Sequence, residues 1–244
     1  MIFRSSYFIV RRMLRDYVGM TILILTPIAL ISVLALLAGG VISESRGIPI
    51  RDEISVTMVF AFLMFSGFYT MEYVKGDLMS SMRWRMYSLP MEVYQHAYSI
   101  LISSTLFSVL QSFTVVIFTI FVFGVYWGNL GIVLLILFVV STVIQFLYIT
   151  FVLWVNNYKT AERLGIGFGM ACLLLSEVWF SFPENKAFQL LSSYSNPFAL
   201  GQNMIFAAIT GENIETALIS LGLLIVSFII LALTAVYFGR RKLI

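Results

Sequence analysis

The 244-residue chain is 60% hydrophobic and only 11% charged, whereas an ordinary soluble domain is about 25% charged. This composition excludes a typical soluble globular protein, and it also excludes a disordered chain, which needs low hydrophobicity and high charge. The net charge of +3 is small and scattered, so no nucleic acid is expected among the partners. The class that remains is an all-α membrane protein forming a single transmembrane domain over residues 1–244.

Long stretches without charged side chains mark the expected membrane spans. A helix needs about 20 apolar residues to cross the hydrocarbon core. The charge-free run 93–158 would be about 100 Å long as one helix, so it must fold back at the Gly- and Asn-containing stretch 126–131. We expect six transmembrane helices at about 18–40, 54–74, 96–125, 131–155, 163–182 and 216–238.

Residues 187–211 carry no charge but are not expected to cross the bilayer. Their Ser-Ser-Tyr-Ser-Asn-Pro centre would free backbone polar groups that lipid cannot satisfy. We interpret this stretch as short re-entrant or interfacial helices on the outer side, before the last span.

The N-terminal residues 2–16 combine four arginines with apolar side chains. This pattern predicts an amphipathic helix that lies on the inner leaflet, with its apolar face toward the lipid and its arginines toward the phosphates. A solvated basic tail is the alternative.

The distribution of basic residues predicts that both termini are cytoplasmic. With six spans and the N-terminus inside, the inner segments hold 12 basic residues and the outer segments hold 3. A seventh span across 187–211 would change this split to 9 against 6. The positive-inside rule therefore favours six spans in a multi-pass protein of the cell membrane, expected to be a bacterial plasma membrane.

The inner loop 75–95 is longer than a connection between two spans requires. It mixes charged and aromatic side chains, and Pro90 suits the first turn of a short helix. These features suggest a docking element, with a plain solvated connector as the alternative.

The order of these features resembles the membrane subunit of a type-2 ABC exporter. The shared features are an amphipathic N-terminal helix, six spans, a cytoplasmic Leu-Pro element after the second span, and an Asn-Pro pair before the last. In that family a segment with a Ser-Leu-Pro-like core forms the coupling helix that contacts the ATPase. Glu72 and Gly76-Asp77-Leu78 resemble its usual lead-in, although Asp77 replaces a Thr and no Glu follows Leu78.

The resemblance assigns roles to particular residues of this chain. Those of the coupling segment are Arg83, Arg85, Ser88, Leu89, Pro90, Glu92 and Tyr94. Those of an outer gate are Asn196, Pro197 and Phe198.

The resemblance also implies that the second and fifth spans line a substrate path. Phe65 and Tyr69 of the second span are candidates for contact with an amphipathic cargo, the alternative being ordinary packing or lipid-facing rings. Glu177 is the one acid well inside an apolar run. We interpret it either as an interfacial carboxylate or as a group that faces the outer path, where it would guide a cationic cargo or pair with Lys186.

The chain lacks the usual motifs of nucleotide and metal chemistry. None of its lysines follows a glycine, as a phosphate-binding loop requires, and one histidine and one cysteine cannot build the usual zinc site. We therefore expect a transport subunit and no enzyme, with no cofactor or metal of its own. ATP and Mg²⁺ would be bound by a separate ATP-binding cassette ATPase subunit.

The expected function is ATP-driven export of a hydrophobic or amphipathic cargo: a drug, a peptide antibiotic or a lipid-like molecule. A second copy of the chain, or a homologue, would complete the path, and self-protection or drug export, as in antibiotic resistance, is favoured. Two alternatives stay open. One is a membrane scaffold or sensor partner that transports nothing. The other is an ion-coupled secondary transporter, a class that usually carries several ionisable groups within its spans.

Overall fold

The computed structural model describes residues 2–43, 47–79, 92–175 and 186–243. Within these residues the chain is helical, and an isolated bridge between Ile42 and Pro49 closes the first turn between long helices. The all-α class is therefore confirmed. The helices are α1 (Ile2–Met13), α2 (Tyr17–Ala38), α3 (Ile50–Phe65), α4 (Gly67–Val74), the π-helix η1 (Lys75–Met79), α5 (Val93–Phe123), α6 (Leu130–Trp154), α7 (Tyr158–Leu175), α8 (Lys186–Tyr194), α9 (Pro197–Thr210) and α10 (Ile214–Leu243).

Five segments of the described chain are long and apolar enough to cross a membrane. They are α2, the continuous stretch α3–α4–η1, which we call the second span, and the helices α5, α6 and α10. Their bounds lie within a few residues of the predicted spans, except that the second span is longer than 54–74. The predicted span 163–182 is described as far as Leu175, within α7, and residues 176–185 lie outside the described part. A sixth crossing therefore stays a prediction.

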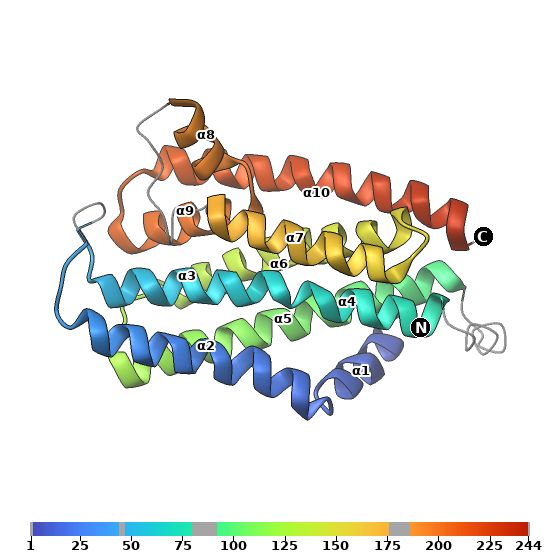
Figure 1. Ribbon diagram of the computed structural model, residues 1–244, viewed down its shortest axis with the longest axis horizontal. Coiled ribbons are helices and arrows are strands. Elements are labelled where there is room, and N and C mark those ends of the chain that lie inside the picture. The colour runs from blue at the N-terminus through green and yellow to red at the C-terminus, as the bar shows by residue number, and fades with distance from the viewer. Residues whose placement is uncertain (1, 44–46, 80–91, 176–185, 244) are drawn as a thin grey trace.

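The long helices run roughly side by side, and both chain termini lie at the same end of the bundle (Figure 1). The end of η1, the start of α5 and the turn between α6 and α7 lie there as well. We call it the basic end, because its described elements carry Arg4, Arg11, Arg12, Arg15, Lys75, Lys159, Arg163, Arg240, Arg241 and Lys242. The turns α2–α3, α5–α6 and α9–α10 lie at the opposite end. The elements thus divide between the two ends in the way that the predicted sidedness requires.

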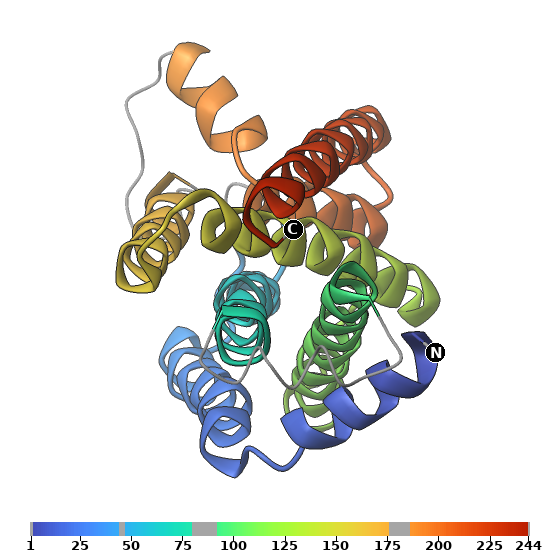
Figure 2. The same ribbon diagram turned by 90° about the vertical axis from the view of Figure 1, so that its right-hand side faces the viewer.

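The second span is the centre of the bundle. Seen from the basic end, it is surrounded by α2, α5, α6 and α7 (Figure 2). In its most apolar stretch 78% of the residues are buried, against 22% for α2 and 17% for α10. Helices α2 and α10 therefore leave most of their apolar side chains available to lipid.

A buried amide joins three of these helices. Gln145 of α6 donates from Nε2 to Ser108 Oγ of α5 at 2.7 Å, and its Oε1 accepts from Thr70 Oγ1 of α4. Gln145 Nε2 also lies 3.3 Å from Ser66 Oγ, at the boundary between α3 and α4. Because lipid offers no competing partner, such contacts contribute about 0.6–2 kcal/mol each.

Tyr148 of α6 fills a gap that glycines leave between α4 and α7. A Cβ on Gly67 would lie 2.4 Å from the Tyr148 ring, and one on Gly165 would lie 3.0 Å from it. The Tyr148 hydroxyl donates to the Gly165 carbonyl oxygen at 3.3 Å. Gly169 faces the same ring, whereas a Cβ on Gly167 would meet no described atom within 4 Å. The small residues of the fifth predicted span thus serve, at least at Gly165 and Gly169, to pack helices within one subunit.

The Tyr148 contact predicts that Gly67→Ala destabilises the protein. The added methyl group would overlap the ring, and overpacking of this kind costs about 1–3 kcal/mol. We expect a lower midpoint of thermal unfolding in detergent. Gly167→Ala is the matched control and should leave the midpoint unchanged or slightly higher. Equal midpoints for the two variants would contradict the packing described.

Candidate functional site

Helix α1 is fixed to α5 through small polar side chains. Ser6 Oγ donates to the Ser99 carbonyl oxygen at 3.3 Å, and Ser103 Oγ lies 3.0 Å from the Ser6 carbonyl oxygen. Ile9 and Met13 are buried beside them. Serines permit the close approach of two helices. This side of α1 therefore packs on protein, whereas the sequence predicted that it would face lipid.

A second apolar stripe of α1 stays exposed. Phe3, Tyr7 and Phe8 are between 55% and 83% exposed, and Leu14, directly after the helix, is 41% exposed. They accompany arginines on the same helix, an arrangement suited to the surface of an anionic bilayer. The amphipathic helix is therefore present, with its apolar residues divided between α5 and the outside.

The carboxylate of Asp77 in η1 contacts side chains from two other elements. Arg12 of α1 donates from Nη1 and Nη2 to its two oxygens at 3.2 and 2.7 Å. His96 Nε2 of α5 lies 3.1 Å from Asp77 Oδ2. We call these three residues the Asp77 cluster. Burial alone would lower the pKa of Arg12, but the hydrogen bond and negative charge of Asp77 raise it, so Arg12 stays charged.

Aromatic rings extend this contact toward α2. The Arg12 guanidinium carbon lies 4.3 Å from the centre of the Tyr73 ring, and Tyr73 stacks on Tyr69 with ring centres 6.4 Å apart. The Tyr69 hydroxyl donates to Asp16 Oδ2 at 3.1 Å. Asp16 caps the start of α2 by accepting from the Gly19 N–H at 3.3 Å. The turn between α1 and α2 is thus held on the second span at both of its ends.

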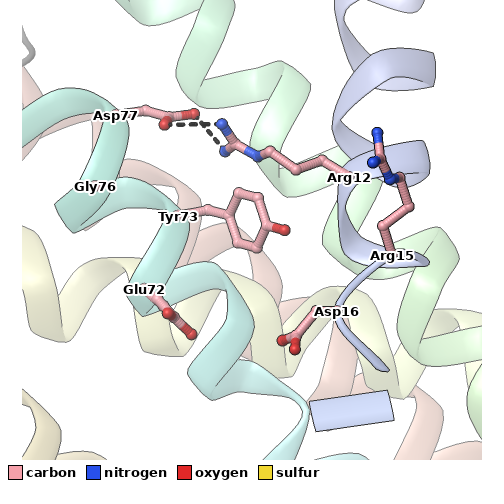
Figure 3. Close-up of a pocket in the computed structure, with 7 residues that line it drawn as sticks. All are labelled: Arg12, Arg15, Asp16, Glu72, Tyr73, Gly76 and Asp77. Atoms are coloured by element: carbon pink, nitrogen blue, oxygen red, sulfur yellow. Dashed lines mark hydrogen bonds and ion pairs between the residues drawn. The ribbon is translucent and has the colours of Figure 1, made fainter. Parts of the chain in front are cut away.

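An open pocket of about 490 Å³ lies between this turn and the second span. Its lining consists of Arg12, Arg15, Asp16, Glu72, Tyr73, Gly76 and Asp77. Figure 3 shows Arg12 reaching across to Asp77, while Arg15 extends along α1, away from Asp16 and Glu72. These groups can pair charges and hold elements together. Among the described residues, no group of three His, Cys, Asp or Glu side chains could hold a metal ion.

The coupling residues predicted from the sequence fall mostly outside the described chain. Arg83, Arg85, Ser88, Leu89 and Pro90 lie in the stretch 80–91, for which the structure describes nothing. Of the remaining two, Glu92 is the residue before α5 and Tyr94 lies in its first turn, 51% exposed at the basic end.

Of the three predicted path residues, the structure describes Phe65 and Tyr69, and their part in a path stays a prediction. Glu177 lies outside the described chain. Phe65 is partly buried and stacks on Phe68 at 6.3 Å, near α7. Tyr69 is 6% exposed and faces the other way, toward Asp16.

The predicted gate residues do lie together, at the start of α9. Asn196 caps this helix by accepting from the Ala199 N–H at 2.8 Å, and Pro197 is its first residue. Phe198 is fully buried, with its ring centre 6.4 Å from that of Phe60 in α3. The described contacts are those of a capped helix end packed on the second span. Their part in gating stays a prediction.

The Asp77 cluster was missed from the sequence. In the sequence, Asp77 stands out only as a departure from a family motif, and His96 only as the one histidine of the chain. The sequence feature that could have indicated the cluster is the one histidine of the chain. It directly follows the inner loop 75–95, and Asp77 lies near the start of that loop. Arg12, which pairs with Asp77, lies 65 residues from it.

The contact between Tyr69 and Asp16 requires glycine at position 19. A Cβ there would lie 2.0 Å from the Tyr69 hydroxyl oxygen, so Gly19→Ala should break the Tyr69–Asp16 hydrogen bond and lower the unfolding midpoint. Tyr69→Phe should lose about 1 kcal/mol. The double variant should be less destabilised than the sum of the two, because the overlapping oxygen is gone.

Gly222→Ala in α10 is the control for this cycle, since its Cβ would meet no described atom within 4 Å. Additive effects of Gly19→Ala and Tyr69→Phe would mean that the two residues do not touch.

Comparison with known protein families gave a match that spans α1 to α9. Residues 5–210 match the family model described as ABC-2 type transporter. A search of curated proteins gave no match. Members of the matched family are transport subunits in the membrane and are not themselves catalytic, and they generally work with an ATPase partner. Because the match covers most of the chain, this multi-pass membrane protein belongs to the ABC-2 type transporter family, as a permease subunit.

Proposed function

We propose that the chain is the permease of an ATP-driven exporter that moves a hydrophobic or amphipathic cargo outward. The observation that carries the proposal is the family match from α1 to α9. The arrangement of the chain supports it, because η1 ends and α5 begins at the end of the bundle where both termini lie. A separate ATP-binding cassette ATPase would bind there, and ATP and Mg²⁺ would be held by that chain.

The path for the cargo would lie between two permease subunits, either two copies of this chain or this chain and a homologue. Within the described part, the second span is packed against helices of the same chain. A route along it through one subunit would require those helices to separate. Closure of the ATPases on ATP would move the coupling segments and switch the pair between inward- and outward-open states.

The cargo class follows from the apolar, aromatic character of the spans. Phe65 and Phe68 stack near α7 and would offer apolar contact to a drug, a peptide antibiotic or a lipid-like molecule once the subunits open. Glu177 would favour a cationic member of this class. The proposed location is a bacterial plasma membrane, where such export protects the cell.

The coupling assignment predicts that replacing Leu89, Pro90 and Tyr94 together by alanine separates transport from ATP hydrolysis. The variant should insert and associate with its ATPase, yet lose most of the cargo-stimulated ATPase activity of the purified complex. Tyr98→Ala is the control, because Tyr98 is an exposed tyrosine one turn further along α5. Full stimulation in the triple variant would place the docking surface elsewhere.

The proposed orientation is tested by labelling single cysteines after replacement of Cys172 by alanine. Asn156 and Glu212 are exposed residues in the turns α6–α7 and α9–α10, at opposite ends of the bundle. A membrane-impermeant maleimide should label Glu212→Cys in intact cells and Asn156→Cys only after permeabilisation. The reverse pattern would invert the orientation, and labelling of both in intact cells would contradict the arrangement of the helices.

A further inference from the structure

We propose that the Asp77 cluster is a positioning site that holds the two ends of the coupling segment together, so that α1, the second span and α5 move as one body with it. This inference rests on the proposed function, because it takes 80–91 as the coupling segment. Asp77 lies three residues before that segment and His96 lies five residues after it.

The first argument is the closure of the loop at its base. The 3.1 Å contact between Asp77 Oδ2 and His96 Nε2 joins η1 to α5 across the whole of residues 80–91. A segment whose ends are fixed loses fewer conformations on docking than one whose ends drift apart. A force applied to a fixed segment also reaches both helices at once.

The second argument is that three contacts close a triangle. The pair between Arg12 and Asp77 joins α1 to η1, with bidentate geometry that fixes direction as well as distance. The pair between Asp77 and His96 joins η1 to α5. Ser6 and Ser103 join α5 back to α1. Three elements connected pairwise cannot shift singly without breaking a contact.

The third argument is burial and local geometry. The side chains of Asp77 and His96 are 19% and 10% exposed, so their contact is partly shielded from water and salt. Asp77 also lies in a π-helical turn, an uncommon geometry that is frequent at functional sites. An ordinary solvated connector would need neither feature.

The test compares Asp77→Asn with Glu72→Gln in the full permease–ATPase complex reconstituted into liposomes. Both changes remove one acid from the second span near the same pocket, but Glu72 is exposed. Asp77→Asn should lower cargo transport per ATP hydrolysed on the order of tenfold, with normal copurification of the ATPase and normal basal hydrolysis. Glu72→Gln should resemble the wild type.

Two further pairs of variants separate positioning from general stability. His96→Ala should show the same loss, whereas His96→Gln, whose amide N–H can still donate to Asp77, should recover most of the transport. Arg12→Gln should uncouple transport more than Arg15→Gln, because Figure 3 shows Arg12, and not Arg15, joined to Asp77. Equal behaviour of Asp77→Asn and Glu72→Gln, or of His96→Ala and His96→Gln, would overturn the proposal.

A reversible cross-link decides whether the cluster stays closed during transport. In the double variant Asp77→Cys/His96→Cys, a short reversible thiol cross-link takes the place of the Asp77–His96 contact. The cross-linked variant should transport at close to the wild-type rate, and release of the cross-link should lower transport as Asp77→Asn does. Loss of transport that is restored on release would show that the ends must separate, and would overturn the proposal. If the wild-type complex transports nothing with its ATPase, the proposed function fails and not the cluster.

Discussion

Close approach of helices at Tyr148 is the contact on which the described bundle depends. Burial of apolar surface does not drive helices together inside a bilayer, since lipid tails are as apolar as leucine side chains. Close packing of complementary side chains and hydrogen bonds between helices must hold the bundle together instead. The Tyr148 ring fits between α4 and α7 because Gly67 and Gly165 carry no side chain, and Gln145, one turn earlier on α6, bonds to α4 and α5. One face of α6 thereby positions the second span in the middle of the subunit.

The basic end is held by a different kind of interaction. Water reaches Arg12, whose side chain is 51% exposed, so charged pairs are tolerated there in a way that the hydrocarbon core forbids. The cost of such a pair is the loss of hydration, and partial exposure keeps that cost low. The kind of contact therefore changes along the bundle axis. In the middle, close packing at glycines and a buried amide hold the helices together. At the basic end, carboxylate–guanidinium and tyrosine–carboxylate contacts do so.

The sequence predicts well those features that depend on neighbouring residues. The expected span 131–155 is found as Leu130–Trp154, because a charge-free run between a Gly- and Asn-rich turn and a polar turn leaves little choice. The Asn-Pro pair also marks a helix start, since Asn196 is an N-cap and Pro197 the first helical residue. Local chemistry is sufficient for both.

Contacts between distant residues could not be predicted in this way. Glycines such as Gly165 and Gly169 permit a close approach of helices, but nothing in the sequence says that Tyr148 fills the space. Asp77 was visible only as a mismatch in a motif, because its partners lie 65 and 19 residues away. At position 77 an acid stands where the family motif has a threonine. Departures from a local sequence pattern are expected at residues that contact partners far away in the sequence.

The burial of the second span constrains how this permease can change conformation. A helix in contact with α2, α5, α6, α7 and α9 cannot slide alone, because packed interfaces resist small displacements and shift between discrete arrangements. Any pull transmitted through η1 therefore acts on the whole central group of helices. Helix α10 is itself packed along α6 and α9, and α2 along α3 and α5, so their exposure to lipid does not free either helix to move alone. Movement of these packed helices as one body, against a second subunit, is the mode of switching that this packing favours.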